Sequence, residues 1–420
     1  MDPERYNARL LPETRVLFRI RGTPDCLMTN DTGPQLQLLR VFCADLNGKV
    51  SMEGYLLGSI FAQDPELIPD LEEVDRPFGE LALDYFRRDP AVDGLLGLAV
   101  GDAFGVPYEF LSRREIALLP LGEMLGCEDA LPFASRWGSL IPRGAWSDDT
   151  SMTVAAMSSV VQKQGQIDYD DIMRQFLLWC DKGLYCSIDQ PFGLGRTVGD
   201  ALRRYRYGKP ALRCGGVGVR DNGNGALMRI FPFSIWCVLR DLDDTETLAV
   251  VRQGAQLTHG HEIAALSCYL YTLFLRECLR TRSPQLAYGY VFAPFRERSV
   301  PYAASFSPEA IEAHSVFREH DLRETFDTSR IRESGYVVDS LVAAVYSLLH
   351  SESYEGAVKA AVRLGYDTDT NAAIVGSIAG AMYGREQIPA RWLQALRRRE
   401  DLIRLGERFS RCVRTAPVAP

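Results

Sequence analysis

Apolar residues recur every three or four positions through most of the chain after residue 92, which is the spacing of one buried face of an α-helix. Few runs with the alternating pattern of a half-buried strand interrupt this periodicity. The pattern therefore predicts a mostly helical body with long loops. The clearest predicted helices cover residues 93–104, 150–163, 172–182, 197–206, 262–280, 338–351, 354–364 and 370–383.

The first 88 residues follow a different pattern. Residues 16–20 and 36–43 are short apolar runs broken by Gly, Pro, Asn and Asp, which favours short strands or buried segments. An acidic loop over residues 64–75 follows, and residues 81–88 favour a short helix. These features predict a small extension of mixed α/β structure.

The change of pattern divides the chain into an extension over residues 1–88, for which we predict a partner-binding role, and a domain over residues 89–420. The formal net charge of −8 disfavours a generic binder of nucleic acid, which needs a basic face. No apolar stretch reaches membrane-spanning length, and the N-terminus lacks the apolar core of a signal peptide. Ten scattered cysteines without CxxC spacing indicate reduced thiols, so we predict a cytoplasmic protein that contacts no membrane.

Two of the predicted helices carry stripes of small residues at a spacing of four. One stripe consists of Gly97, Gly101 and Gly105, and the other of Ala372, Gly376, Gly380 and Gly384. Each glycine in a helix costs about 1 kcal/mol relative to alanine, so a stripe of them needs a structural reason. The usual reason is the close approach of a neighbouring helix, and we predict such packing for both stripes.

Paired acids mark the start of one predicted helix. Ser147, Asp148, Asp149 and Thr150 directly follow a tryptophan and precede an apolar-periodic segment. A single acid or hydroxyl there would cap the helix and interact with the positive end of its dipole. Two adjacent acids flanked by hydroxyls exceed what a cap requires.

A second cluster of the same kind appears more than half the chain later. Asp367, Thr368, Asp369 and Thr370 again precede a predicted helix. Either cluster alone could equally be a helix cap or a turn. Two such clusters together favour a site for divalent cations, because carboxylates and hydroxyls are the oxygen ligands that Mg²⁺ and Mn²⁺ prefer. Neither cluster contains the His or Cys ligands typical of zinc.

Seven segments within residues 93–395 combine glycines, acids and hydroxyls in a fixed order. They are GLLGLAVGDAFGVPYEF (94–110), WSDDT (146–150), GLGRTVGDAL (193–202), NGNGALMRIFPF (222–233), THGHEIA (258–264), GYVVDSLVAA (335–344) and LGYDTDTNAAIVGSIAGAMYG (364–384). In this order they resemble the motifs of the ADP-ribosylglycohydrolase family, which includes the dinitrogenase-reductase-activating glycohydrolases. Each motif alone is weak, but seven in order are specific. The resemblance implies an orthogonal all-α helical bundle.

The resemblance also implies a site with two divalent cations, Mg²⁺ or Mn²⁺. Its implied metal ligands are Ser147, Asp148, Asp149, Asp367, Asp369 and Thr370. Catalytic roles fall on Glu109, Asp148 and Asp149, with either Glu109 or Asp149 assisting proton transfer. The ADP-ribose pocket would be shaped by Gly195, Asn222, Gly223, Asn224, Gly225, His259 and Tyr336.

Three positions depart from the family pattern. Ser147 stands where threonine is usual, although its hydroxyl can still bind a cation. Tyr366 replaces a common glycine, and Gly193 lies where several relatives that act on ADP-ribosyl-arginine place an aspartate. The last departure weakens any inference about the linkage that is cleaved.

Some of the candidate residues suit purely structural roles. A lone buried histidine such as His259 is more often a hydrogen-bonded core residue than part of a site. Arg229 fits a structural ion-pair partner better than a phosphate contact. Asp102 and Asp339 suit a role in orienting neighbouring loops.

The resemblance implies a hydrolase that removes ADP-ribose from modified proteins, with arginine as the expected attachment site. The bond at the ribose anomeric carbon would break through an oxocarbenium-like transition state. Some family members with a similar layout act as immunity proteins, which adds a cognate ADP-ribosyltransferase toxin to the expected partners.

Two further functions remain as alternatives. Residues 1–88, with their apolar segments and acidic loop, could dock on a basic cleft, so the chain could inhibit such a toxin sterically. A non-enzymatic relative that kept only the fold is disfavoured, because a scaffold has no need of four converging carboxylates.

Overall fold

A computed structural model describes residues 89–119, 121–129, 137, 140–324 and 326–416, together with the backbone of five short strands before residue 74. Contacts divide the chain into two compact units. One unit comprises residues 1–88 with 279–283, and the other comprises residues 89–278 and 284–420. The second unit is called the helical body below.

The five strands of the first unit form one antiparallel sheet. They are β1 (Phe18–Ile20), β2 (Asp25–Thr29), β3 (Arg40–Ala44), β4 (Val50–Glu53) and β5 (Leu71–Glu73), in the order β4-β3-β2-β1-β5. The register pairs Phe42 of β3 with Met52 of β4, and Phe18 of β1 with both Cys26 of β2 and Glu73 of β5.

The two strands that the sequence predicted correspond to β1 and β3. Residues 71–73 of the predicted acidic loop form β5, a strand that the sequence pattern did not indicate. The rest of that loop and the predicted helix over residues 81–88 lie outside the described residues.

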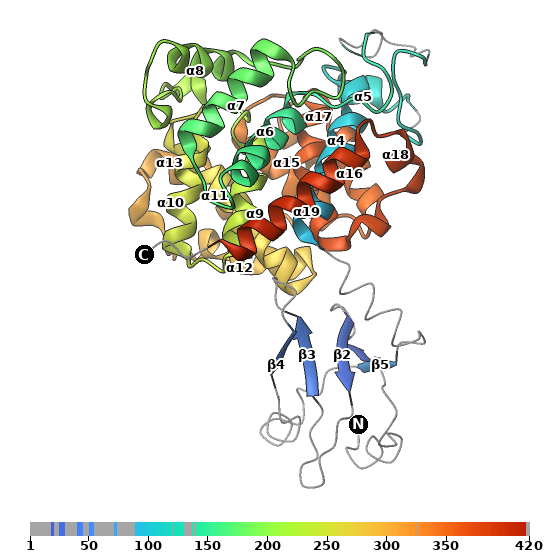
Figure 1. The fold of residues 1–420 in the computed structure, drawn as a ribbon. Coiled ribbons are helices and arrows are strands. Elements are labelled where there is room, and N and C mark those ends of the chain that lie inside the picture. Colours follow the sequence, from blue (N-terminus) through green and yellow to red (C-terminus); the bar gives the residue numbers. More distant parts are fainter. Residues whose placement is uncertain are drawn as a thin grey trace, which may run out of the picture. The chain divides into compact units, whose positions relative to one another are not determined.

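Helices make up nearly all of the regular structure in the described part of the helical body (Figure 1). The longer ones are α4 (Pro90–Gly105), α6 (Asp148–Gln162), α7 (Tyr169–Lys182), α8 (Arg196–Arg206), α9 (Phe231–Leu239), α10 (Asp244–Gln256), α11 (Glu262–Thr281), α12 (Pro284–Glu297), α15 (Val337–Leu349), α16 (Tyr354–Arg363), α17 (Thr368–Tyr383) and α19 (Arg399–Thr415). Short helices are α5 (Arg113–Ile116), α13 (Pro308–Ala313), α14 (Val316–Glu319) and α18 (Ala390–Ala395). All eight predicted helices are confirmed, and so is the all-α class of the body.

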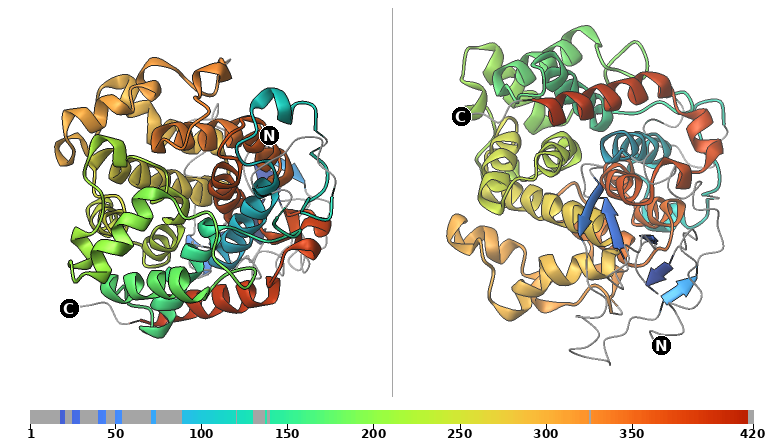
Figure 2. Two further views of the ribbon diagram at one scale, coloured as in Figure 1. Left: turned by 90° about the horizontal axis from the view of Figure 1, so that it is seen from above. Right: turned by 60° about the horizontal axis from the view of Figure 1, so that its bottom comes forward.

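The centre of the body is the pair α4 and α17, which lie side by side (Figure 2). Every residue of α4 after Pro90 is buried, and so is every residue of α17 before Tyr383. A helix that is apolar or small on all sides is expected in the middle of a bundle rather than on its surface. The loops at one end of this pair carry the acids of the candidate site.

The glycine stripes are where these two helices touch. A Cβ added to Gly97 would lie 2.9 Å from the Cα of Gly380, and one added to Gly376 would lie 2.9 Å from the carbonyl carbon of Gly97. A Cβ on Gly101 would lie 2.6 Å from the carbonyl carbon of Ala372. The predicted close approach is therefore confirmed. Gly384 is an exception, because it ends α17 with a φ of +88° instead of packing within the stripe.

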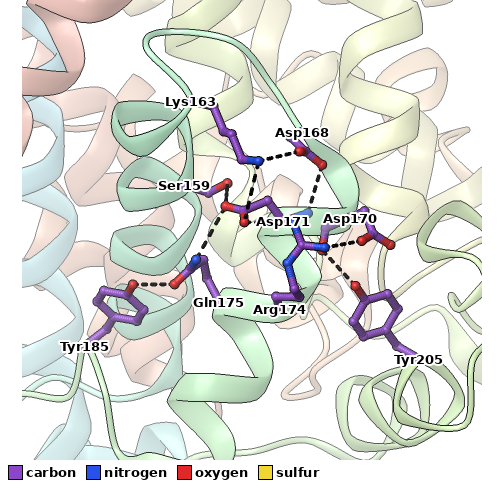
Figure 3. Close-up of polar contacts among 9 residues, drawn as sticks. All are labelled: Ser159, Lys163, Asp168, Asp170, Asp171, Arg174, Gln175, Tyr185 and Tyr205. Carbon is purple, nitrogen blue, oxygen red and sulfur yellow. Dashed lines mark hydrogen bonds and ion pairs between the residues drawn. The ribbon is translucent and has the colours of Figure 1, made fainter.

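A polar network links α6 to α7, and α7 to α8 (Figure 3). The Ser159 hydroxyl of α6 donates to the carboxylate of Asp171 at 2.6 Å, and the ammonium group of Lys163 lies 2.9 Å from the carboxylate of Asp168. The Tyr205 hydroxyl of α8 donates to the backbone oxygen of Asp170 at 2.9 Å. These contacts fix the end of α6 opposite to its acidic N-terminus.

No helix in the described part of the chain combines the length and the apolar character needed to cross a bilayer.

Candidate active site

Asp102 of α4 anchors the first turn of α6. Its carboxylate accepts hydrogen bonds from the backbone N–H of Ser147 at 3.0 Å, from the backbone N–H of Thr150 at 3.0 Å and from the Thr150 hydroxyl at 2.7 Å. The orienting role expected of Asp102 agrees with these contacts. They fix the Ser147–Thr150 cluster relative to the central helix pair.

The two acid clusters of the sequence meet at Asp149. The Ser147 hydroxyl caps α6 and donates to Asp149 Oδ2 at 3.1 Å, while the Thr370 hydroxyl of α17 donates to the same oxygen at 3.3 Å. The other carboxylate oxygen of Asp149, Oδ1, is buried and accepts no hydrogen bond from the described residues. A buried carboxylate oxygen without a donor is costly, so it suits a bound cation or a reacting group.

A second group of carboxylates lies beside the first. One oxygen each from Glu109, Asp367 and Asp369 lies within 4.8 Å of the others. The Asn224 side-chain amide donates to Asp367 Oδ2 at 2.8 Å and to the Ser340 hydroxyl at 2.9 Å. Asn224 therefore orients Asp367, while its contact with the substrate stays a prediction.

Burial and mutual repulsion raise the pKa values of Asp148, Asp149 and Asp369. Burial, with the neighbouring charge of Asp102, raises the pKa of Asp148 to about 8. The pKa of Asp369 is raised well above its usual range, mainly by burial and secondly by repulsion from the charges of Glu109 and Asp149. Crowded carboxylates with raised pKa values are the electrostatic condition that a divalent cation relieves. The donors are all oxygens, which fits Mg²⁺ or Mn²⁺.

The loop of residues 222–225 pairs with the N-terminal end of α15. The Asn224 backbone N–H donates to Gly335 O at 2.9 Å, and the Val337 N–H donates to Asn222 O at 3.0 Å. An antiparallel bridge links Gly223 with Tyr336 between these two bonds. The structure thus brings together Tyr336 and the loop that the sequence predicted as its neighbours in the pocket.

His259 lies under the same loop. Its Nδ1 is 2.9 Å from the Thr258 hydroxyl, and a Cβ added to Gly225 would lie 2.9 Å from its Cε1. Burial, with the nearby charge of Arg229, lowers the pKa of His259 to about 3, so the ring is neutral. The position matches the expected buried, hydrogen-bonded histidine, and the ring also lies against Gly225, another residue that the sequence predicts for the pocket.

Gly195 caps the N-terminus of α8. It is exposed at the start of α8, with open space where a side chain would be. Two residues earlier, Gly193 has a φ of +89°, and a Cβ there would lie 3.0 Å from Asp148 Cγ. The loop that carries Gly195 therefore passes the first acid cluster, and glycine at 193 fits both the backbone conformation and the lack of space.

Arg229 and Asp339 have structural roles. Arg229 is completely buried and donates to Gly254 O at 3.1 Å and to the Thr258 hydroxyl at 2.6 Å. Asp339 accepts from Arg332 Nε at 2.9 Å and from the Ser334 hydroxyl at 2.7 Å, which orders the segment before Tyr336. Asp339 has the orienting role expected from the sequence. The structural role expected of Arg229 is also found, but among the described residues its bonds go to a backbone oxygen and a hydroxyl, and no acid pairs with it.

Phe110 and Tyr366 form an aromatic pair that the sequence did not indicate. Both have left-handed backbone conformations, with φ of +67° and +63°, and their rings meet edge to face at 5.3 Å. The Phe110 N–H donates to Tyr366 O at 2.6 Å, and the Tyr366 N–H donates to Leu111 O at 2.8 Å. These two bonds join the segments that carry Glu109 and Asp367. The only signal in the sequence was a tyrosine in place of the usual glycine.

Comparison with known proteins finds relatives of this chain. A family model described as ADP-ribosylglycohydrolase matches residues 84–417. The chain is 29% identical to the ADP-ribosylarginine hydrolase Tri1 of Serratia proteamaculans, over 82% of this chain and 81% of that protein. It is 28% identical to the ADP-ribosyl-[dinitrogen reductase] glycohydrolase of Rhodospirillum rubrum, over 74% and 90% of the two chains.

A solved structure described as an ADP-ribosylglycohydrolase-related protein complex is also similar. It superimposes with a TM-score of 0.59 at 28% identity, covering 77% of this chain and 98% of that one.

Proposed function

Because the chain belongs to the ADP-ribosylglycohydrolase family, we propose that it removes ADP-ribose from arginine side chains of modified proteins with two divalent cations, Mg²⁺ or Mn²⁺, as cofactors. Its family and its named hydrolase relatives make the chain an ADP-ribosyl hydrolase. The observation that carries the metal-dependent form of the proposal is the meeting of the two acid clusters at Asp149 and Thr370, which lie 221 residues apart in sequence. The name of the Serratia relative favours arginine as the attachment site.

The cations would be held by Ser147, Asp148, Asp149, Asp367, Asp369 and Thr370. When bound, they would hold ribose hydroxyls and make a bound water more acidic. The protein side chains would then complete the hydrolysis: the water oxygen adds to the anomeric carbon of the ribose as the bond to the arginine nitrogen breaks, and a protein carboxylate passes the proton of the water to the departing guanidine nitrogen. Glu109 and Asp149 are the candidates to accept that proton, because both are buried carboxylates in this cluster.

The rest of the substrate would lie along the 222–225 loop. The glycines of this loop leave its backbone open to close approach, so its N–H groups, other than the Asn224 N–H that donates to Gly335 O, suit the pyrophosphate. The neutral His259 and the half-buried Tyr336 border this loop and would complete the pocket, with Gly195 at the start of α8.

The proposed activity predicts that the purified protein releases ADP-ribose from an arginine-ADP-ribosylated protein only when Mg²⁺ or Mn²⁺ is present. Excess chelator should abolish the release because the crowded carboxylates cannot position the sugar alone, and added metal should restore it. Free ADP-ribose measured by chromatography gives the readout. Metal-independent release would contradict the role given to the acid clusters, and the absence of release with either metal would remove the proposed activity.

A second function concerns residues 1–88, which we propose bind and inhibit an ADP-ribosyltransferase toxin, giving immunity in addition to the hydrolysis. The observation that favours it is the separate sheet, whose edge strands β4 and β5 have one side unpaired among the described strands. Such edges accept strands from other proteins. We place both activities in the cytoplasm, because the eight cysteines in the described residues form no disulfide.

Deletion of residues 1–88 is expected to abolish binding to an arginine-specific ADP-ribosyltransferase while hydrolysis of free ADP-ribosyl-arginine persists. The reason is that the carboxylate cluster lies entirely within the helical body. Binding is measured by calorimetry, with the full chain as the control. An unchanged affinity after the deletion would exclude the extension from the interface.

A further inference from the structure

The segment from α8 to the 222–225 loop is strongly basic in an acidic protein. Residues 196–221 contain seven arginines and lysines but only two aspartates, whereas the whole chain has 47 basic and 55 acidic residues. Residues 203–220, which we call the α8 surface, form the outer part of this segment at the edge of the body (Figure 1). A local reversal of charge on this scale attracts a partner of opposite sign.

Three exposed cations of the α8 surface have no ion-pair partner among the described residues. They are Lys209, Arg213 and Arg220. Others nearby are neutralised: Arg203 lies 2.9 Å from Asp200, and Arg196 lies 3.1 Å from Asp221. The unpaired cations therefore keep their full charge for an external group.

Large apolar side chains alternate with these cations. Tyr207 is 82% exposed, Val217 is 73% exposed and Val219 is 71% exposed. Single exposed apolar residues are ordinary, but these three highly exposed ones, with Leu212 at 38% exposed, lie within thirteen residues of one basic segment and indicate a contact surface. Tyrosine and arginine are also the residues most often found at energetic centres of interfaces.

The backbone beneath this surface is fixed. Gly215 N–H donates to Gln256 O at 3.0 Å, Gly216 N–H donates to Thr258 O at 3.0 Å, and Gly260 N–H donates to Gly216 O at 2.7 Å. These bonds hold the segment on the loop that follows α10. An ordered segment that displays apolar groups loses little conformational entropy when it binds a partner.

The surface also contains a hollow. A cavity of about 460 Å³ opens between α8 and the following turn, lined by Asp200, Arg203, Arg204, Tyr207 and Lys209. Its lining has three basic groups, one acid and one aromatic ring. This combination suits an acidic side chain beside an apolar one.

The α8 surface ends at the candidate substrate loop. The Arg196 guanidinium, at the start of α8, donates to Arg220 O at 2.9 Å, and the short helix Val219–Asp221 leads directly into Asn222. Gly216 also forms a β-bridge with His259. A protein whose ADP-ribose occupied the 222–225 loop would therefore place its own surface against residues 203–220.

We propose that the α8 surface docks the protein that carries the ADP-ribose, and that this protein presents acidic and apolar residues around its modified arginine. The proposal rests on the proposed function for the position of the ADP-ribose, and adds the kind of target that the enzyme selects. The local positive charge would also offset the repulsion between an acidic target and a chain of net charge −8.

The test uses the full chain and two synthetic peptides of equal length, each with one ADP-ribosyl-arginine. One peptide flanks the arginine with Glu and Leu, and the other with Lys and Ser. Binding is measured by fluorescence anisotropy in chelator, which prevents metal-dependent turnover. We expect the wild-type chain to bind the acidic peptide at least roughly tenfold more tightly, with a smaller difference at high salt.

The double variant Arg213→Glu/Arg220→Glu should lose this preference, whereas Arg411→Glu on the exposed face of α19 should keep it. Tyr207→Ser should weaken the binding of the acidic peptide by a factor that is the same at low and high salt. With metal, all of these variants should hydrolyse free ADP-ribosyl-arginine with wild-type kcat and KM, which also shows that they are folded.

Several outcomes would overturn the docking proposal. The first is that the wild-type chain binds both peptides equally tightly. The second is that Arg411→Glu loses the preference for the acidic peptide as much as the double variant does. The third is that the wild-type chain binds a single-stranded oligonucleotide as tightly as it binds the acidic peptide. Conversion of a dimer to a monomer by the double variant, seen by sedimentation, would assign the surface to contacts between copies instead. Failure of the wild type to hydrolyse free ADP-ribosyl-arginine would contradict the proposed function but would leave the peptide preference to be judged separately, because that preference is measured without turnover.

Discussion

Gly376→Val is expected to lower the free energy of unfolding of the helical body by more than about 4 kcal/mol, or to prevent its folding. A Cβ at this position would lie 2.9 Å from the carbonyl carbon of Gly97 and closer still to its oxygen, so α4 and α17 would have to separate. The backbone oxygen of Gly97 also accepts a hydrogen bond from the Tyr354 hydroxyl at 2.6 Å. Separation would therefore break a buried bond as well as the central helix contact.

The measurement is denaturant unfolding followed by circular dichroism, with Gly199→Ala as the control. Gly199 lies within α8, and a Cβ there would meet only Leu194 side-chain atoms at 3.7 Å or more. Alanine at 199 should stabilise the protein by about 0.5–1 kcal/mol, because it restricts the unfolded chain without a clash. A Gly376→Val protein as stable as the wild type would show that the two helices do not pack through their glycines.

The sequence predicted this contact because glycines repeated every four residues would only weaken a helix that had no close neighbour. The apolar pattern of the sequence did not predict α19, although Leu402, Phe409 and Val413 have helical spacing and are buried. Its many arginines and acids hide that pattern in the average composition of the segment. Strands of three to five residues, such as β4 and β5, are too short for any periodicity to stand out.

The residues of the candidate site were also more predictable from the sequence than the contacts between them. Acids and hydroxyls at two helix starts indicated a cation site, because their number exceeded what caps require. Which acids meet is decided by tertiary packing: Glu109 lies beside Asp367 and Asp369, and Asn224 orients Asp367 across 143 residues of sequence.

Backbone conformation was equally invisible in the sequence. A φ of +63° at Tyr366 accounts for the glycine that is common there in the family, since a left-handed conformation costs other residues about 1–2 kcal/mol. The tyrosine therefore retains a conformation that favours glycine, in exchange for a ring contact with Phe110.

Asp369→Asn is expected to reduce the release of ADP-ribose by roughly 10³-fold or more, the effect of losing several kcal/mol of electrostatic stabilisation in the transition state. The side chain is buried at the start of α17, within 4.8 Å of carboxylate oxygens from Glu109 and Asp367. Asparagine keeps the size of the side chain but removes the charge that would hold a cation. The initial rate with saturating Mn²⁺ is the measurement.

The same substitution should not destabilise the metal-free protein, and this separates a binding role from a structural one. Burial and the charges of Glu109 and Asp149 raise the pKa of Asp369 well above its usual range, so its ionised form weakens the fold when no cation is bound. Removing the charge should therefore leave the metal-free melting temperature unchanged or higher, while abolishing the rise that Mn²⁺ causes in the wild type.

Asp401→Asn is the matched control for this substitution. Asp401 is an exposed acid whose carboxylate lies 2.9 Å from Arg398 and 2.6 Å from Arg404. Surface ion pairs of this kind contribute little, so both the activity and the Mn²⁺-induced rise in melting temperature should stay at wild-type values. If Asp369→Asn also kept that rise together with full activity, Asp369 would not be a ligand, and the cations would have to be held by the other proposed ligands, Asp367 and Thr370 with the Ser147–Thr150 cluster.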